Sequence, residues 1–395
     1  MKKILYISDQ SPFNNSYGAQ QRTSLLYNIL CEIGHVDLVC FTSEPIPQTT
    51  LRPNCTIKYF GELPIKVHSK IVIRLKKLCN IFFSFSPYSV YDKNRDASKI
   101  ANNLLKNNQY DRIVIRYIKN AFMCGLLGDK RIIVDVDDLP EQSIMSYVDT
   151  IKISKLKYLQ YKFYAKRAKF HTDHFLKRIN HSFLPNENQC KWTNSSYLPN
   201  IPFPNKNGAQ YLSGSLPDDN EFGVFFIGFM HHSPNIQGVE YFIKNIWQKV
   251  TDTVPNAVFR IAGKGVTPEQ KIVWEKNAGV QVLGFVSDIF NEYKKCKVVV
   301  VPIYYGAGTN IKVLEAMSVG RACVITDFVA KAFNNDLIDD ENILVARNDQ
   351  DFANKVTQLL LDKNLNMKIV SNGSRIIKEK YSYSTFIESV NKYIF

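Results

Sequence analysis

Residues 297–326 constrain the fold more than any other part of this 395-residue chain. They comprise an apolar run, KVVVVPI, then a glycine-bearing turn, GAGTN, a helical stretch, and a second apolar run, RACVIT. Apolar runs of this length, bounded by turn formers, are typical of strands buried on both faces in parallel sheets. Parallel strands need a crossover connection, usually a helix. The segment therefore predicts an α/β fold with the turn at the carboxyl end of a strand, where such sheets bind ligands.

The turn has the composition of a phosphate cradle. Gly308 permits close approach of a ligand to the backbone, and the N–H groups of Thr309, Asn310 and Ile311 lie at the positive end of the following helix dipole. Glu315 lies about one and a half turns further on, near enough to accept hydrogen bonds from ribose hydroxyls. The pattern indicates a nucleotide diphosphate, and a plain tight connection without a ligand is the alternative that it leaves open.

Strands and helices alternate along both halves of the chain, which predicts two parallel-sheet domains. Hydrophobic periodicity stops in the turn-rich stretch 199–220 and restarts after it. Strands are expected near 3–8, 36–42, 55–60, 112–116, 131–136, 182–184, 222–228, 257–262, 280–285, 297–302, 322–326 and 342–346. Helices are expected near 19–33, 67–82, 92–108, 153–178, 350–362 and 364–395.

Composition supports a folded intracellular protein. The hydrophobic fraction of 45% suffices for two cores. The amino terminus has too short an apolar run for a signal peptide, and no stretch is long enough to span a bilayer. The 8 cysteines lack metal-ligand spacing, so reduced thiols are expected. The expected location is the cytoplasm, with the inner face of the membrane as a further expectation.

The net charge of +14 is concentrated in two basic, aromatic stretches, 66–88 and 152–170. Cations mixed with bulky apolar groups suit an anionic lipid interface, and peripheral membrane contact through these stretches is one interpretation. A solvated basic face with its aromatic side chains in the core is the other. Nucleic acid is not expected as a partner, because no zinc-finger, RRM, KH or helix-turn-helix signature is present.

Several segments of the second half resemble the family 4 retaining glycosyltransferases, group 1 enzymes of the GT-B fold. They are FGVFFIGFMHHSPNIQGVEYFI (222–243), FRIAGKG (259–265), VQVLGFVSD (280–288) and the GAGTN segment, in the family's order. The first half resembles the family more loosely, at KILYISD (3–9), GAQQRTSLLYNIL (18–30) and RIIVDVDDLPEQS (131–143). The resemblance implies two Rossmann-like domains facing a central cleft. These are an acceptor domain at 1–205, a donor domain at 206–375, and a last helix at 376–395 that returns to the first domain.

The resemblance also implies a set of site residues. Besides the turn and Glu315, the expected donor-binding residues are Gly18, Asn235, Lys264, Phe285 and Val286. Asp137 stands where a histidine is often found and is a second catalytic candidate, with Asp138 and Ser143 as acceptor-binding candidates. Arg22 would add a positive charge or pair at the surface. His231 and His232 are further candidates for phosphate or sugar contacts. No metal ion or other cofactor is expected.

The implied reaction is transfer of a sugar, with retained configuration, from a nucleotide-diphosphate donor to a hydroxyl of a glycan or lipid-linked acceptor. Cell-surface polysaccharide or glycan assembly is the expected setting. The chain departs from the family's pattern at Ala307, where a first glutamate is widespread, and at Asn310, where a GGGTR-like branch has arginine. The usual Arg and Lys diphosphate clamp is also not evident. A catalytically silent GT-B scaffold of a polysaccharide assembly complex is therefore the alternative.

Overall fold

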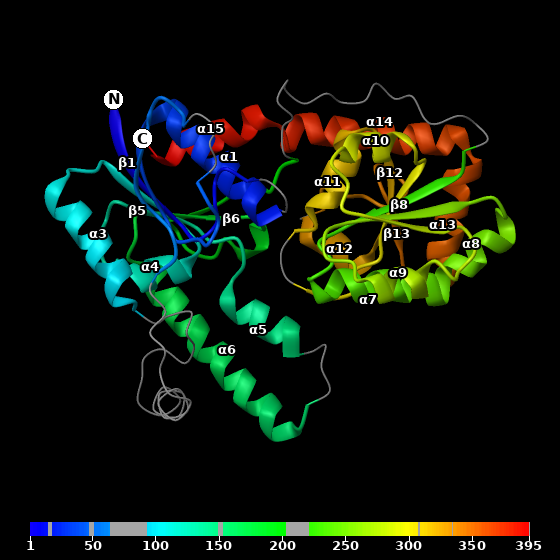
Figure 1. Cartoon of the computed structure of the whole chain (residues 1–395), viewed down its shortest axis with the longest axis horizontal. Coiled ribbons are helices and arrows are strands. Elements are labelled where there is room, and N and C mark those ends of the chain that lie inside the picture. The colour runs from blue at the N-terminus through cyan, green and yellow to red at the C-terminus, as the bar shows by residue number, and fades with distance from the viewer. Residues whose placement is uncertain are drawn as a thin grey trace. The chain divides into compact units, whose positions relative to one another are not determined.

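The computed structural model describes residues 1–14, 18–46, 51–63, 93–148, 153–202, 221–306, 309–333 and 335–394. The chain divides into two compact units, Met1–Pro199 with Ile387–Phe395, and Asn200–Phe386. Each unit contains its own sheet, and the paired strands of both sheets are parallel (Figure 1). The predicted α/β class, with two parallel-sheet domains, is confirmed.

The first unit has the strand order β3-β2-β1-β4-β5-β6-β7. Its strands are β1 (Lys2–Ser8), β2 (Gly34–Cys40), β3 (Cys55–Phe60), β4 (Arg112–Arg116), β5 (Ile132–Asp135), β6 (His181–Leu184) and β7 (Ser195–Tyr197). Its helices are α1 (Gly18–Ile33), α3 (Arg95–Asn107), α4 (Ile118–Cys124), α5 (Pro140–Val148) and α6 (Lys155–Leu176). The order reverses between β1 and β4, and open α/β sheets generally bind their ligands outside the carboxyl ends of the strands at such a reversal.

The second unit has the strand order β10-β9-β8-β11-β12-β13. Its strands are β8 (Gly223–Ile227), β9 (Val258–Ala262), β10 (Val280–Gly284), β11 (Val298–Val301), β12 (Ala322–Thr326) and β13 (Leu344–Ala346). Its helices include α7 (Ser233–Phe242), a π-helical turn (Ile243–Trp247), α8 (Gln248–Thr253), α9 (Pro268–Trp274), α10 (Ile289–Lys294), α11 (Ile311–Ser318), α12 (Asp327–Ala330), α13 (Asp349–Leu361) and α14 (Lys363–Lys380). The order reverses between β8 and β11.

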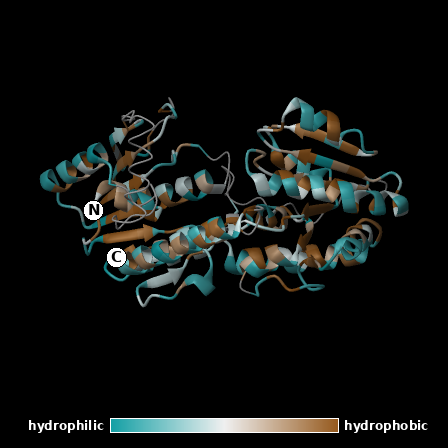
Figure 2. Ribbon diagram, turned by 90° about the horizontal axis from the view of Figure 1, so that it is seen from below, coloured by the Kyte–Doolittle hydropathy of each residue, from teal (hydrophilic) through white to brown (hydrophobic). Residues whose placement is uncertain are grey.

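Apolar strands form the interior of each unit. The four valines of β11 are all fully buried between β8 and β12, as the continuous apolar run predicts. Figure 1 shows α7 and α9 on one side of this sheet and α11 and α14 on the other. In Figure 2 the strands are largely brown, whereas the helices around them alternate brown and teal. This is the pattern of a sheet covered by amphipathic helices.

The predicted strands agree with the structure within a few residues, but several helices differ. The short helices α4 and α5 and the three-residue strand β7 were not predicted. The helix predicted at 67–82 lies outside the described residues. The prediction of one helix over 364–395 is wrong, because α14 ends at Lys380 and α15 covers Tyr383–Ile394. Ser382 separates them, since its Oγ accepts the N–H of Thr385 at 3.3 Å in the first turn of α15.

The end of α15 packs on the first unit. The ring of Tyr393 stacks on His181 in β6 with the ring centroids 3.9 Å apart. His181 Nε2 also lies 2.7 Å from Ser196 Oγ in β7. None of the helices in the described part of the chain combines the length and apolarity needed to cross a bilayer.

Candidate functional site

The connection from β11 to α11 contains the predicted phosphate cradle. Gly306 has a φ of 132°, a backbone conformation that other residues rarely adopt. Thr309 Oγ1 accepts a hydrogen bond from Asn200 Nδ2 at 2.8 Å. Asn310 occupies the N-cap position of α11 without a capping hydrogen bond from its side chain, and Ile311 begins the helix. Ala307 and Gly308 lie outside the described residues.

The loop after β8, residues 228–232, lies close to the end of β9. Met230 N–H donates to the carbonyl of Lys264 at 2.8 Å, whereas the Lys264 side chain is exposed. Gly263 is required here, because its φ is 151° and a Cβ at this position would lie 1.8 Å from the carbonyl oxygen of Gly228. The backbone contact thus holds the loops after β8 and β9 together.

Asn235 connects the β8 loop with α11. Its side chain is buried in the first turn of α7, and its Nδ2 donates to the Phe229 carbonyl at 2.9 Å. Its Oδ1 accepts a hydrogen bond from Lys312 Nζ at 2.7 Å. Asn235 in α7 therefore contacts the first turn of α11, although it lies 77 positions from Lys312 in the chain.

Lys312 is the residue that sequence reasoning missed. Its ammonium group is buried 4.4 Å from the ring centroid of Phe226 in β8, and burial lowers its pKa to about 7. Glu315, half-buried one turn later on α11, partly opposes this shift by its charge. The sequence does contain one indication that Lys312 is buried, because this lysine lies on the otherwise apolar face of the helix IKVLEAM.

Phe285 and Val286 follow β10 at the same edge of the sheet. Phe285 is 69% exposed, and Val286 is half-buried. The carbonyl of Gly284 accepts the N–H of Gly263 at 2.7 Å, which joins this turn to the end of β9. An exposed aromatic ring beside the two loops provides an apolar surface for a flat group such as a nucleobase.

The two histidines of the β8 loop have different surroundings. The ring of His231 packs edge-on against Phe229 at 5.1 Å, close to Gly265. The pKa of His232 is lowered by burial and by the charge of Lys312. His232 is therefore neutral at physiological pH and lies near Lys312.

In the first unit, buried arginines surround Asp135 at the end of β5. Arg22 Nη2 lies 2.6 Å from Asp135 Oδ1, and Arg116 Nη1 lies 3.1 Å from Asp135 Oδ2. Arg22 also donates to the carbonyls of Leu198 and Pro199. The expectation that Arg22 pairs at the surface is wrong, because its long-range partner lies in the core.

Asp137 and Asp138 extend from this buried network. Asp137 Oδ2 accepts hydrogen bonds from Arg116 Nη2 at 2.6 Å and from the Tyr117 hydroxyl at 3.1 Å. Burial, with the negative charge of Asp137, raises the pKa of Asp138 to about 7. Ser143, in α5, donates back to the Leu139 carbonyl at 3.4 Å. These groups provide a charged anchor and a carboxyl group that exchanges its proton near neutral pH.

Gly18 is the first residue of α1, the helix that follows β1 in the chain. Asn120 in α4 donates to Asp9, which follows β1, at 2.9 Å. The predicted residues of the first unit thus follow β1 and β5. No group of three or more His, Cys, Asp or Glu side chains suited to a metal ion occurs among the residues described.

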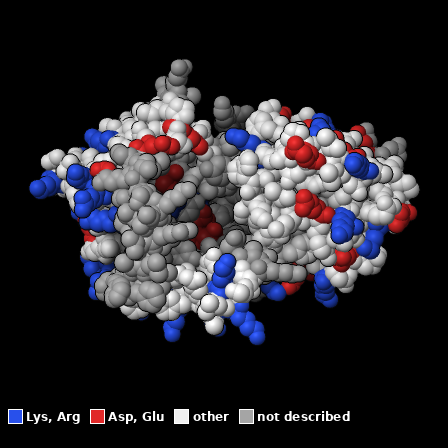
Figure 3. All heavy atoms as spheres, turned by 60° about the horizontal axis from the view of Figure 1, so that its bottom comes forward, with Lys and Arg blue, Asp and Glu red and all other residues white. Residues whose placement is uncertain are grey.

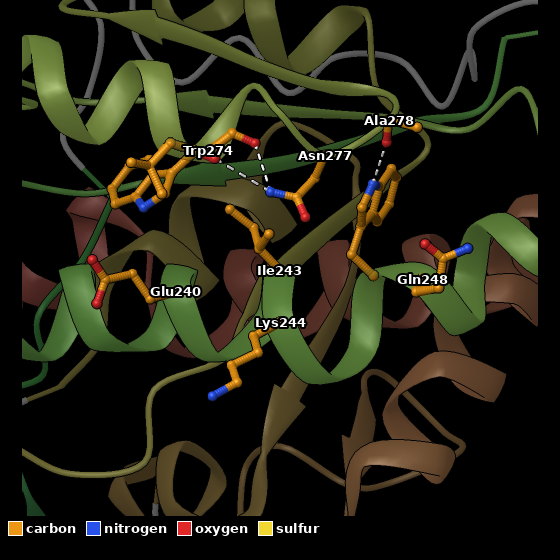
Figure 4. A pocket seen from close by; sticks show the side chains of 9 residues that line it. Glu240, Ile243, Lys244, Gln248, Trp274, Asn277 and Ala278 are labelled. Carbon is orange, nitrogen blue, oxygen red and sulfur yellow. Dashed lines mark hydrogen bonds between the residues drawn. The ribbon is translucent and has the colours of Figure 1, made fainter.

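A surface pocket of about 400 Å³ lies elsewhere in the second unit (Figure 4). It is formed by α7, the π-helical turn, α8, α9 and the turn after α9. In Figure 4, Lys244 points away from Trp274 and Asn277, and Trp247 Nε1 donates to the Ala278 carbonyl at 2.8 Å. None of the residues predicted from the sequence lines this pocket.

Part of this chain matches a known protein family, and the whole chain resembles several solved structures. Residues 221–362 match the model of the family described as Glycosyl transferases group 1. No curated protein matches the chain. Sucrose-phosphate synthase from Thermosynechococcus elongatus is similar in structure, with a TM-score of 0.69 and 14% identity over 99% of this chain and 98% of that one.

Two further structures match over nearly the whole length. WaaG, a glycosyltransferase involved in lipopolysaccharide biosynthesis, has a TM-score of 0.63 and 12% identity, with 99% of each chain covered. The Anabaena protein HepE in complex with UDP and glucose has a TM-score of 0.58 and 14% identity, also with 99% of each chain covered. The chain therefore has the GT-B fold, and residues 221–362 form a group 1 glycosyltransferase domain.

Proposed function

We propose that this chain is a retaining glycosyltransferase of family 4, in the GGGTR-like branch. It transfers a sugar from a nucleotide-diphosphate donor to a hydroxyl of a glycan or lipid-linked acceptor in cell-surface polysaccharide assembly. One observation supports the proposal. Among the described residues, the predicted donor residues from Asn235 to Glu315, spread over 80 positions, lie in the first turn of α7, in the connections after β9, β10 and β11, and on α11, at one edge of the sheet in the matched domain.

The donor would bind along this edge. The diphosphate takes the N–H groups of Thr309, Asn310 and Ile311, with Gly308 allowing close approach and Lys264 adding a charge. Glu315 accepts hydrogen bonds from the ribose hydroxyls. Phe285 and Val286 hold the base. The complex of HepE with UDP and glucose makes a uridine nucleotide the first donor to test.

The first domain supplies the acceptor side of the reaction. Asp138 and Ser143 bind the acceptor hydroxyl, and Asp137 is the catalytic candidate beside them. The hydroxyl attacks on the face that the diphosphate leaves, and the departing phosphate oxygen takes its proton. The protein then orients the reactants and stabilises the developing negative charge, and no covalent nucleophile is needed.

The exposed part of α6 supports an acceptor presented at a membrane. Residues 155–172 include six Lys or Arg and no Asp or Glu. Leu156, Leu159 and Phe163 are 79%, 61% and 49% exposed and recur at helical spacing. Figure 3 brings the lower side of Figure 1 forward, and Lys and Arg side chains project from the surface there. Apolar and cationic groups on one exposed helix suit an anionic bilayer surface. Residues 66–88, the other basic stretch, lie outside the described residues.

The donor site is tested by thermal unfolding of the purified chain with UDP-, GDP-, dTDP- and ADP-sugars. A ligand at a hundred times its Kd stabilises the folded state by about 2.7 kcal/mol, which raises the Tm by a few degrees. We expect a shift with one nucleotide in the wild type and a much smaller shift in Glu315→Gln. Glu240→Gln, an exposed change on α7, is the matched control.

Hydrolysis or transfer of the stabilising nucleotide sugar completes the test. Slow hydrolysis with retained configuration supports the enzyme. Binding without any turnover, across a panel of glycan and lipid-linked acceptors, favours the silent scaffold. An equal thermal shift in wild type and Glu315→Gln contradicts the assignment of Glu315.

A further inference from the structure

Lys312 is a buried ammonium group, and no buried counter-ion contacts it in the described part of the chain. It is 9% exposed, and among the described residues its hydrogen-bond partner is Asn235, a neutral amide. The ring of Phe226 covers a further side of the ammonium group. Glu315 and His232 are the titratable groups that interact with it electrostatically, and neither forms a salt bridge with it.

Such an arrangement is energetically costly. An ammonium group has three donors, and moving it from water into the protein requires hydrogen bonds and an opposite charge. Asn235 accepts one hydrogen bond and contributes no charge. The free-energy cost of burying the ammonium group is therefore only partly compensated, and an anion bound nearby would offset much of this cost.

The ammonium group lies where a phosphate is expected. A Cβ on Gly228 would lie 3.1 Å from Lys312 Nζ and 2.9 Å from Asn235 Cγ, so the charge is directly beside the backbone of the β8 loop. Lys312 is also in the first turn of α11, an eight-residue helix whose N-terminal end is the positive end of its dipole. The buried charge and the helix end therefore attract an anion to the same edge of the sheet.

We propose that Lys312 is the counter-charge for the donor diphosphate, supplied from the first turn of α11. The identity of the ligand rests on the proposed function. The interaction acts at short range in low-dielectric surroundings, where a charge has a larger effect than at the surface. Asn235 holds the ammonium group in position beside the loop.

Proton uptake on binding follows from this placement. With a pKa of about 7, Lys312 is largely neutral in the free protein at pH 8. A diphosphate favours the charged form, so each binding event takes up part of a proton from solvent. His232 is neutral at pH 8, since its pKa is lowered, and Glu315 attracts a proton to Lys312 in both states.

The test is isothermal titration calorimetry at pH 8 in two buffers of different ionisation enthalpy, with inorganic diphosphate and with UDP as probes. We expect the wild type to take up a fraction of a proton per ligand. Lys312→Met is expected to bind at least tenfold more weakly, with no uptake. Lys312→Arg, which stays charged at this pH, is expected to bind without uptake. Lys244→Met, an exposed lysine on the π-helical turn, is the control.

The outcomes separate this inference from the proposed function. Unchanged affinity and proton uptake in folded Lys312→Met overturn the inference and leave the function standing. Binding of diphosphate with Lys312-dependent uptake, but no binding of any nucleotide sugar, supports the inference and overturns the function. If neither probe nor any nucleotide sugar binds, both are wrong. Circular dichroism establishes that each variant is folded.

Discussion

Arg116 donates a hydrogen bond to Asp137 Oδ2 across 2.6 Å and anchors an aspartate whose backbone φ is 45°. Tyr117, which donates to the same oxygen, has a φ of 64°. A positive φ is unfavourable for a residue other than glycine. Each of these two residues, which follow adjacent strands, therefore costs about 1–3 kcal/mol of conformational free energy. The fully buried Arg116 contributes contacts that hold them there. Strain of this kind is commonly found at functional sites, which is consistent with the proposed acceptor site after β5.

Asp138 makes the stability of the first unit depend on pH. Its pKa is raised from 3.8 to about 7, so the folded state favours the protonated carboxyl group. The stabilisation is present below about pH 4 and is lost as pH rises through 7. Asp138→Asn, which cannot ionise, is expected to be more stable than wild type at pH 8 and to lose this advantage at pH 4. Urea denaturation at both pH values measures it, with the exposed Asp252→Asn as control. An equal stability difference at both pH values would contradict the prediction.

The stack of Tyr393 on His181 gives a second pH-dependent prediction. Burial lowers the His181 pKa to about 4, so its neutral form contributes stability that is present above pH 6.5 and lost as pH falls toward 4. Tyr393→Ala is expected to cost about 1–2 kcal/mol at pH 7 and to raise the His181 pKa toward 6.5. Tyr393→Phe keeps the ring and is the matched control. NMR titration of the histidine ring measures the pKa, and an unchanged value in Tyr393→Ala would refute the assigned packing.

The strands of the second unit and the turn before α11 were predictable because their signals are local. Four successive valines identify β11, and the glycines that follow identify the turn before α11. The structure then places Asn235 beside α11, where its Oδ1 accepts a hydrogen bond from Lys312. Phe285 lies exposed just after β10, and its role in holding the base stays a prediction.

Features that depend on distant partners were not predictable. Arg22 pairs with Asp135, which is 113 positions away, so the sequence left its burial open. Lys312 interacts with Asn235 across 77 positions, and a lysine in the first turn of a helix is ordinarily solvated. Helix α4 follows Tyr117, whose positive φ has no signal in the sequence. In each case tertiary contacts, rather than local propensity, determine the conformation.

The exposed face of α6 predicts binding to anionic vesicles. Burial of one leucine side chain contributes about 1.5–3 kcal/mol, so Leu156→Ser with Leu159→Ser is expected to lower the membrane partition coefficient at least tenfold. Co-sedimentation with phosphatidylglycerol-containing vesicles measures this, and pure phosphatidylcholine vesicles are expected to bind less. High salt should weaken binding, because it screens the lysines. Ile272→Ser with Val273→Ser, an exposed apolar pair on α9, is the matched control. If the α6 variant binds as well as the control variant, α6 is not the membrane-contacting surface.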